Sequence, residues 1–195
     1  TRASVVERLG TLRERGGLLF PSAGAAKDGS ALRTEVHCRV VDTPHGELIV
    51  SVVRDVTHRV LAEESLHRLA YHYRLTGLAN RAKLENELES ALAGADRHHD
   101  CVGVVFLDLD DFKPINDELG HATGDRVLQI VAERLAGAVR EGDTVARLGG
   151  DEFVLLVQRL AGPGDLALVA HKVVAAIEQP IHVAEHAIGV TASAG

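Results

Sequence analysis

Residues 147–153, Arg-Leu-Gly-Gly-Asp-Glu-Phe, lie between two apolar runs, Thr144–Ala146 and Phe153–Val157. A pair of glycines between two strand-like runs predicts a tight β-hairpin, because glycine adopts positive φ angles without steric cost. Such a turn would present Asp151 and Glu152 at the end of a sheet, where the backbone can also approach a ligand closely. The heptad therefore predicts a sheet whose turn carries two carboxylates.

A second strand-like run lies upstream of this hairpin. Val104–Leu107 leads directly into Asp108, and Asp110 and Asp111 follow. Two strands that end in carboxylates indicate a site for a hard cation, since Mg²⁺ is usually shared between one or two carboxylates and substrate phosphates. Acids at a single turn more often belong to an ordinary solvated hairpin, so the interpretation depends on the surrounding motifs.

Those motifs occur in a definite order. They are Leu-Thr-Gly-Leu-Ala-Asn-Arg at 75–81, Phe-Leu-Asp-Leu-Asp-Asp-Phe-Lys-Pro-Ile-Asn-Asp-Glu-Leu-Gly-His-Ala-Thr-Gly-Asp at 106–125, Arg-Glu-Gly-Asp at 140–143, and the heptad. In this order and spacing they resemble the GGDEF family of diguanylate cyclases, from Tyr73 to Gly195. The resemblance implies a nucleotidyltransferase that condenses two GTP into cyclic di-GMP, with one GTP per subunit at the interface of a homodimer.

The resemblance also implies a metal site and the catalytic residues. The implied metal ligands are Asp108, the carbonyl of Leu109, Asp151 and Glu152, and the implied cofactor is Mg²⁺ or Mn²⁺. Asp151 and Glu152 are the implied catalytic residues, with Glu152 either a second metal ligand or a proton acceptor. Joining a 3′-hydroxyl to an α-phosphate requires charge neutralisation and in-line positioning, which metal ions held by carboxylates supply.

Five further positions match the family's nucleotide contacts. Asn116 and Asp125 match its guanine-binding pair, and a carboxylate can accept hydrogen bonds from N1–H and N2 of guanine together. Phosphate binding is implied at the turn of Asp111, Phe112 and Lys113, because free N–H groups at a helix start favour anions. Outside this context, Asp125 is also explained as an acid in the first turn of a helix, and Lys113 as a solvent-exposed lysine.

Arg140 and Asp143 stand in the spacing Arg-x-x-Asp upstream of Gly149 and match the family's inhibitory site for its own product. The planar fork of arginine can bind phosphate or the edge of guanine, and the carboxylate can accept from guanine N–H groups. The alternative is an arginine at a helix end, bonded to the last carbonyls of that helix, beside a turn aspartate.

The chain departs from the family pattern in two places. The family usually has an acid two residues before Leu75, where it couples linker and catalytic domain by a salt bridge, and this chain has Tyr73. The family also continues past the position of Gly195 into a helix whose basic residues contact the phosphates. The chain contains no methionine and ends within a predicted strand, Ile188–Gly195, so we expect a fragment that binds GTP weakly and turns it over poorly or not at all.

The N-terminal residues have a different pattern. After a short helix, turns at Lys27–Ser30 and Pro44–Gly46 bracket a predicted strand, Ala31–Val41, and a return strand, Glu47–Val53, follows. This pattern resembles the C-terminal half of a PAS sensor domain. We therefore predict a PAS-like part (1–57), a helical linker (58–72) and a GGDEF domain (73–195).

The linker is predicted to be a helix, Thr57–His72, capped by Thr57. Ala62, Leu66, Leu69 and Tyr73 form a narrow apolar seam of the coiled-coil type. An ordinary amphipathic helix packed on its own domain is the alternative. In a homodimer, a parallel pair of such helices would set how the two catalytic domains face each other.

The catalytic region is predicted to be an α/β fold, an α+β sandwich of the cyclase and polymerase-palm type. A mostly antiparallel central sheet would be flanked by helices, with the partial PAS-like β-rich segment at the N-terminus. The predicted elements are a strand over Gly103–Leu109, the hairpin, and helices over Ala82–Ala95, Thr123–Arg140 (capped by Thr123) and Asp165–Gln179.

Composition limits the possible partners and location. The formal charge of −7 argues against a nucleic-acid polymer, which requires a basic face. No apolar run approaches the roughly 20 residues needed to span a bilayer, so we expect a cytoplasmic module, whatever segments anchor the parent protein. The alternative to a cyclase is a catalytically inactive GGDEF domain that binds GTP or cyclic di-GMP for regulation.

Overall fold

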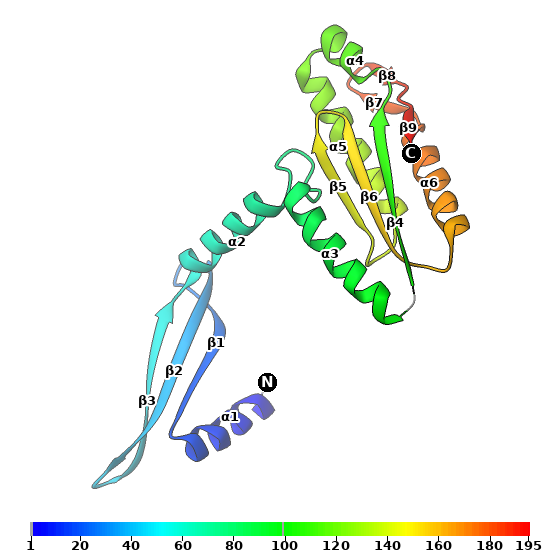
Figure 1. Cartoon of the computed structure of the whole chain (residues 1–195). Coiled ribbons are helices and arrows are strands. Elements are labelled where there is room, and N and C mark those ends of the chain that lie inside the picture. Colours follow the sequence, from blue (N-terminus) through cyan, green and yellow to red (C-terminus); the bar gives the residue numbers. More distant parts are fainter. Residues whose placement is uncertain (1, 99) are drawn as a thin grey trace. The chain divides into compact units, whose positions relative to one another are not determined.

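The structure, a computed structural model, describes residues 2–98 and 100–195 of the chain. Its helices and strands form two units, and the boundary between them lies in the sequence between His67 and Arg68. Each unit contains a sheet of its own (Figure 1). In the part of the chain that the structure describes, no helix has the length and hydropathy needed to cross a membrane.

The N-terminal unit is a three-stranded antiparallel sheet preceded by a helix. Helix α1 (Arg2–Arg15) leads into β1 (Gly17–Ala25), β2 (Ala31–Thr43) and β3 (Gly46–Asp55), in the order β1-β2-β3. The prediction of only two strands was wrong, because β1 pairs with β2 along its whole length. Strand β1 contains two glycines and a proline, which have low strand propensity. Pairing with β2, rather than local preference, therefore forms this strand.

Helix α2 (Thr57–Tyr71) confirms the helix predicted over Thr57–His72 but not its cap. The Thr57 hydroxyl accepts a hydrogen bond from the Arg33 N–H of β2, at 2.8 Å. The Thr57 N–H instead donates to Asp55 Oδ1, also at 2.8 Å, so Asp55 supplies the side-chain oxygen at the helix start. Because α2 ends at Tyr71, Tyr73 does not extend the predicted seam of the helix.

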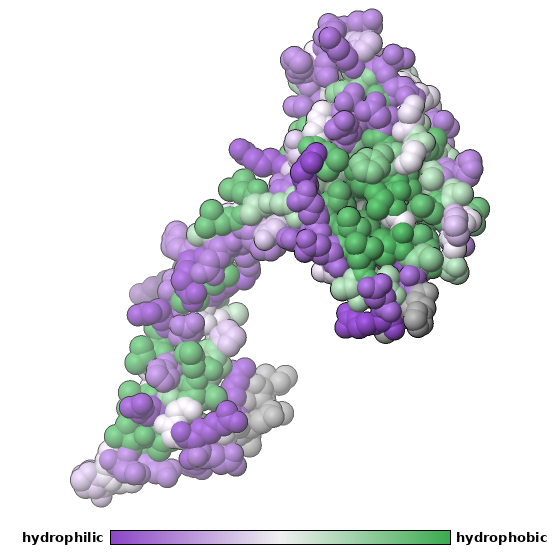
Figure 2. All heavy atoms as spheres, viewed as in Figure 1, coloured by the Kyte–Doolittle hydropathy of each residue, from purple (hydrophilic) through white to green (hydrophobic). Residues whose placement is uncertain are grey.

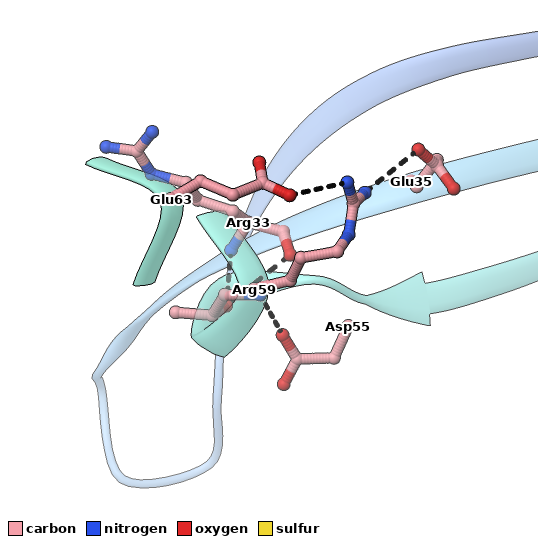
Figure 3. Close-up of polar contacts among 6 residues, drawn as sticks. Arg33, Glu35, Asp55, Arg59 and Glu63 are labelled. Atoms are coloured by element: carbon pink, nitrogen blue, oxygen red, sulfur yellow. Dashed lines mark hydrogen bonds and ion pairs between the residues drawn. The ribbon is translucent and has the colours of Figure 1, made fainter. Parts of the chain in front are cut away.

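Ion pairs hold the first turns of α2 against β2. Arg59 lies 3.4 Å from Glu35 of β2 and 3.4 Å from Glu63 of its own helix (Figure 3). Arg33 of β2 reaches Glu64 at 2.7 Å. Exposed ion pairs contribute little individually to the free energy of folding. Together with the Asp55 cap, these pairs therefore orient the start of α2 and add little to the stability of the unit.

The second unit contains a four-stranded sheet in the order β5-β6-β4-β9, in which all neighbouring strands are antiparallel. The strands are β4 (Cys101–Leu109), β5 (Thr144–Gly149), β6 (Glu152–Leu160) and β9 (Ala192–Ala194). This arrangement confirms the predicted mixed α/β fold with an antiparallel central sheet.

Helices cover both faces of this sheet (Figure 1). Helices α5 (His121–Ala138) and α6 (Pro163–Ile177) pack on one face, and α3 (Arg81–His98) packs on the other against β5 and β6. The core on the first face includes Val105, Leu107 and Leu109 of β4 with Leu135 and Ile177. On the α3 face, Phe106 is 59% exposed, and Figure 2 shows apolar residues gathered on the sheet beside α3.

Two helix starts differ from the prediction. Gly120, with φ of 83°, occupies the N-cap position of α5, and the Thr123 hydroxyl donates to the Leu119 carbonyl at 2.9 Å instead of capping the helix. Helix α6 starts at Pro163, since proline suits the first turn of a helix, where its missing N–H needs no partner.

The turn after β4 leads into a helix, and the C-terminal residues differ from the prediction. Helix α4 (Phe112–Leu119) has Pro114 as its third residue. A proline here leaves no bond unmade, because the first four N–H groups of a helix have no partner within it. Where a single strand was predicted over Ile188–Gly195, a hairpin of β7 (Ile181–Val183) and β8 (His186–Ile188) precedes the short β9, because the chain turns back before it reaches β4.

The loop after α2 attaches to the edge of the sheet at β5. The Ala79 N–H donates to the Val145 carbonyl at 3.2 Å, and the Arg147 N–H donates to the Ala79 carbonyl at 2.9 Å. This one-residue bridge places the loop 72–80 beside the strand β5, which leads into the turn 150–151.

Candidate active site

The predicted hairpin is formed by β5 and β6. Gly149 pairs with Glu152, so Gly150 and Asp151 are the central residues of the turn. Gly150 has φ of 48°, which glycine adopts without strain. Gly149 belongs to β5, and a Cβ atom added to it would lie 3.8 Å from the Tyr73 hydroxyl. Gly150 therefore allows the turn, whereas Gly149 is the last residue of the strand that precedes it.

Strand register brings Asp108 and Glu152 side by side. They are Cα partners in the β4–β6 ladder, so their side chains lie on the same face of the sheet. Both side chains are exposed, and both line a hollow of about 560 Å³. The Asp151 carbonyl accepts a hydrogen bond from the Leu109 N–H at 3.3 Å. The four residues expected to bind metal thus meet at one end of the sheet.

Oxygen donors at this end suit a hard divalent cation. The N–H and C=O of a strand residue point to the same side, so the Leu109 carbonyl faces the turn, as its N–H does. Among residues 2–98 and 100–195, no three Asp, Glu, His or Cys side chains converge closely enough to hold a metal alone. Mg²⁺ keeps several waters and binds substrate phosphates. An open set of oxygen donors fits that behaviour better than it fits a closed structural metal site.

The two expected guanine contacts lie where α4 meets α5. Asn116 is half-buried on α4 and Asp125 is exposed on α5. A Cβ atom at Gly124 would lie 2.0 Å from the Asn116 Oδ1 atom. Asn116 can therefore lie against the first turns of α5, next to Asp125, only because residue 124 has no side chain.

The expected phosphate-binding turn joins β4 to α4. Asp111 occupies the N-cap position with φ of 54° and ψ of 28°, and its side chain makes no capping hydrogen bond. The N–H groups of Phe112 and Lys113 lie in the first turn, where no helix carbonyl accepts them. The Phe112 side chain is buried in the core, whereas Lys113 is exposed. The turn offers backbone donors and one ammonium group to an anion.

Arg147 was not singled out from the sequence, although it begins the heptad. It is 6% exposed, so its guanidinium group is buried. Its Nε and Nη2 atoms donate to the Gly150 carbonyl at 3.0 and 2.6 Å. Burial lowers the pKa of Arg147, whereas Tyr73, Asp125 and Asp151 act to raise it. The available signal was a charged residue directly after the strand-like run Thr144–Ala146.

Arg140 and Asp143 lie together at the opposite end of β6 from the turn. The Arg140 Nη2 atom donates to the Gln158 carbonyl at 2.5 Å, and Nε lies 3.4 Å from Asp143 Oδ2. The Asp143 side chain is 3% exposed and accepts from the Gln158 N–H at 3.1 Å. The alternative of an arginine bonded to its own helix end was wrong, because α5 stops at Ala138 and the guanidinium group turns to β6.

A hollow of about 210 Å³ adjoins this pair. Its lining includes the cationic Arg140, Arg159 and Lys172 and the acidic Asp143 and Asp165. Six residues of β6, about 20 Å of extended strand, separate Gln158 from Glu152 at the turn. This hollow and the carboxylates of the turn are therefore two separate locations on the domain.

The family model described as "Diguanylate cyclase, GGDEF domain" matches residues 70–195. The diguanylate cyclase TpbB of Pseudomonas aeruginosa is 46% identical over 121 residues, which cover 62% of this chain and 28% of that protein. The bifunctional diguanylate cyclase/cyclic di-GMP phosphodiesterase MucR of the same organism is 46% identical over 134 residues, covering 69% of this chain and 19% of that protein. The chain thus spans less than a third of either curated relative.

Solved structures show the same fold. The GGDEF domain of TpbB from Pseudomonas aeruginosa has a TM-score of 0.62 at 43% identity, covering 64% of this chain and 73% of that one. The coiled coil and GGDEF domain of DgcB from Caulobacter crescentus, in complex with cyclic di-GMP, has a TM-score of 0.65 at 28% identity. That match covers 72% of this chain and 75% of the DgcB chain.

Proposed function

Because the chain belongs to the GGDEF family of diguanylate cyclases, we propose that its second unit condenses two GTP into cyclic di-GMP and pyrophosphate. The observation that carries this proposal is the cross-strand pairing of Asp108 with Glu152 beside the turn residue Asp151. It supplies oxygen donors at the open end of a rigid sheet, which is the arrangement that nucleotidyl transfer needs.

Cyclases of this family generally need a divalent metal ion, and we propose Mg²⁺ or Mn²⁺ here. When bound, the ion lowers the pKa of the attacking 3′-hydroxyl and neutralises charge on the phosphates. Asp108, Asp151, Glu152 and the Leu109 carbonyl would hold it. The exposed Glu152 carboxylate could instead accept the proton of the hydroxyl, since it lines the same hollow as Asp108.

The nucleotide would be bound at two further places. Asn116 and Asp125 would bind the guanine edge, with the Asp125 carboxylate accepting from N1–H and N2. The N–H groups at Asp111, Phe112 and Lys113, with the Lys113 ammonium group, would bind the terminal phosphates. Adenine lacks the donor pair that Asp125 recognises, so this arrangement would select GTP over ATP.

Condensation of two GTP requires two nucleotide sites, and the chain carries one set of these residues. We therefore propose a homodimer through α2 and the catalytic domains. Leu66 and Leu69 of α2 are 66% and 57% exposed, and no residue of this helix is buried. Two apolar side chains one turn apart on an uncovered helix suit a parallel pairing with a second copy.

We assign control of the cyclase to the N-terminal unit. Its three-stranded sheet and the helix that leaves it suit a PAS-type sensor, with domain limits at 1–57, 58–72 and 73–195.

We assign product inhibition to the hollow at Arg140 and Asp143, because its cationic side chains suit the phosphates and guanines of cyclic di-GMP. A module with these substrates would act in the cytoplasm.

The test is the formation of cyclic di-GMP from GTP and Mg²⁺, followed by chromatography and mass spectrometry. It is made on this chain and on the chain extended past Gly195 with the corresponding segment of a GGDEF relative. Product from either supports the proposal, and Asp151→Asn should abolish it while the melting temperature stays close to wild type. GTP binding without product from either version would favour the alternative, an inactive domain that binds nucleotide for regulation.

An unfolded Asp151→Asn protein, or one with the wild-type rate, would remove the metal-ligand role of Asp151. GTP binding to the same variant, measured by calorimetry, separates these results from a general loss of the nucleotide site.

A further inference from the structure

Tyr73 stands where the family resemblance implies an acid, and its ring faces the guanidinium group of Arg147. The Arg147 Cζ atom lies 4.8 Å from the centroid of the ring. At this distance the face of an aromatic ring attracts a cation, and the attraction is stronger where water is excluded. Arg147 is buried, so the contact is of the stronger type.

Arg147 in turn bonds the catalytic turn. Two hydrogen bonds from its guanidinium group go to the Gly150 carbonyl. That carbonyl belongs to the peptide group that joins Gly150 to Asp151, so its orientation fixes the direction in which Asp151 leaves the turn. Arg147 thus connects Tyr73 to the residue directly before Asp151, a proposed metal ligand.

The backbone holds the two partners next to each other. The Tyr73 N–H donates to the Leu78 carbonyl and its carbonyl accepts from the Gly77 N–H, both at 2.8 Å. The Arg147 N–H donates to Ala79 in the same loop, at 2.9 Å. Because main-chain bonds position both residues, the stacking is not a chance contact between mobile side chains.

The same loop is bonded to the last turn of α2. The Asn80 N–H donates to the Tyr71 carbonyl at 2.9 Å, and Asn80 Nδ2 donates to the Ala70 carbonyl at 2.8 Å. The residue that contacts Arg147 therefore belongs to the segment that receives the end of the linker helix.

We propose that Tyr73 is a positioning residue for the turn 149–152 and acts through Arg147. The face of its ring holds the guanidinium group in the orientation that bonds the Gly150 carbonyl, and the hydroxyl is not required. An aromatic ring does this without burying a second charge, whereas a carboxylate would have to be desolvated together with Arg147. Only the effect on turnover depends on the proposed cyclase function.

The test compares Tyr73→Phe, which keeps the ring, with Tyr73→Leu, which removes it. Amide hydrogen exchange of the turn should be about fivefold faster in Tyr73→Leu and within about twofold of wild type in Tyr73→Phe. Peptides from α5 and central β6 should not change. In the Arg147→Lys background, Tyr73→Leu should add little further, because residues that act through each other are not additive.

Turnover provides a second readout. Tyr73→Leu should lower kcat about tenfold. The KM for GTP should change by less than about twofold, because Tyr73 is not one of the residues proposed to bind guanine or phosphate. Tyr73→Phe should retain the wild-type kcat. If neither this chain nor its extended version makes cyclic di-GMP, the cyclase proposal fails, and the exchange measurement still decides the role of Tyr73.

Three exchange results would overturn the inference. They are an unchanged turn in Tyr73→Leu, faster exchange throughout the second unit, and a Tyr73→Phe protein that behaves like Tyr73→Leu. The second would reduce Tyr73 to a packing residue, and the third would assign its effect to the hydroxyl.

Discussion

Gly124 is the residue on which the placement of Asn116 depends. In Gly124→Ala the new methyl group would meet the Asn116 side chain at 2.0 Å, so that side chain must move. We expect GTP affinity to fall about tenfold, because one of two guanine contacts is lost. The melting temperature should change little, since alanine favours the helix. Calorimetry with GTP measures the effect.

Gly137→Ala is the matched control on the same helix, since an added Cβ there meets nothing within 4 Å. It should leave GTP binding unchanged and raise stability slightly. If Gly124→Ala binds GTP as the wild type does, Asn116 makes no important contact with the base.

Asp125 is the residue proposed to select the base. Asp125→Ala should reduce the preference for GTP over ATP at least tenfold, because the carboxylate pairs with donors that adenine lacks. Phosphate affinity, measured with ATP or inorganic triphosphate, should change far less. Competition binding with the two nucleotides measures the ratio, and Asp117→Ala on α4 is the control. An equal loss for both nucleotides would make Asp125 only an acid near a helix start.

The Asp55 carboxylate accepts a hydrogen bond at the start of helix α2. Hydrogen bonds from Thr57 lower the pKa of Asp55 in the folded chain. Asp55 therefore stabilises the fold fully above its ordinary pKa of about 4, and this contribution is lost as the pH falls through the lowered folded value. Asp55→Ala should lower the melting temperature at about pH 7 but not at about pH 2.

Circular dichroism melting at the two pH values measures this difference, with Asp42→Ala near the end of β2 as the control. An Asp55→Ala deficit that persists unchanged at low pH would mean that packing, and not the carboxylate, is lost.

Arg140 connects the end of one element to the end of another, since it follows α5 and bonds the last residues of β6. If the adjoining hollow binds cyclic di-GMP, Arg140→Ala should weaken that binding at least tenfold, because a charged donor to phosphate is lost. GTP binding should remain, since the turn lies about 20 Å away along β6. Calorimetric titration of both nucleotides measures this.

Arg97→Ala on α3 is the control, because Arg97 bonds only the Ala93 carbonyl of its own helix in the described contacts. A wild type that does not bind cyclic di-GMP, or a mutant that binds it equally well, would leave Arg140 with its bonds to β6 as its whole role.

The proposed dimer depends on the exposed leucines of α2. Changing both Leu66 and Leu69 to Lys should raise the dimer dissociation constant at least about tenfold, or 1.4 kcal/mol. The apolar contact is lost and like charges face each other. Analytical ultracentrifugation measures the constant, and cyclic di-GMP formation should fall in parallel.

Leu168→Lys on α6 is the matched control, because that leucine is 70% exposed on a different helix. A double mutant that sediments as the wild type does would show that the dimer forms elsewhere, or not at all.

Elements that short sequence patterns specify could be predicted. The hairpin β5–β6 follows from glycines between strand-like runs, and β4 follows from an apolar run that ends in Asp108. Strand β1 was not predictable, because its glycines and proline oppose a strand and only pairing with β2 forms it. The cap of α2 was misassigned, because the hydroxyl of Thr57 found a partner in β2.

Neighbours along the chain set the turn residues, helix starts and strand ends, so the chemical groups of the site and their order could be predicted from the sequence. Their meetings could not: Asp108 with Glu152, Asn116 with Gly124, and Tyr73 with Arg147 come together only in the fold. Such contacts depend on strand register and helix packing. A slip of one residue between β4 and β6 would turn a carboxylate to the other face of the sheet, and no local pattern specifies that alignment.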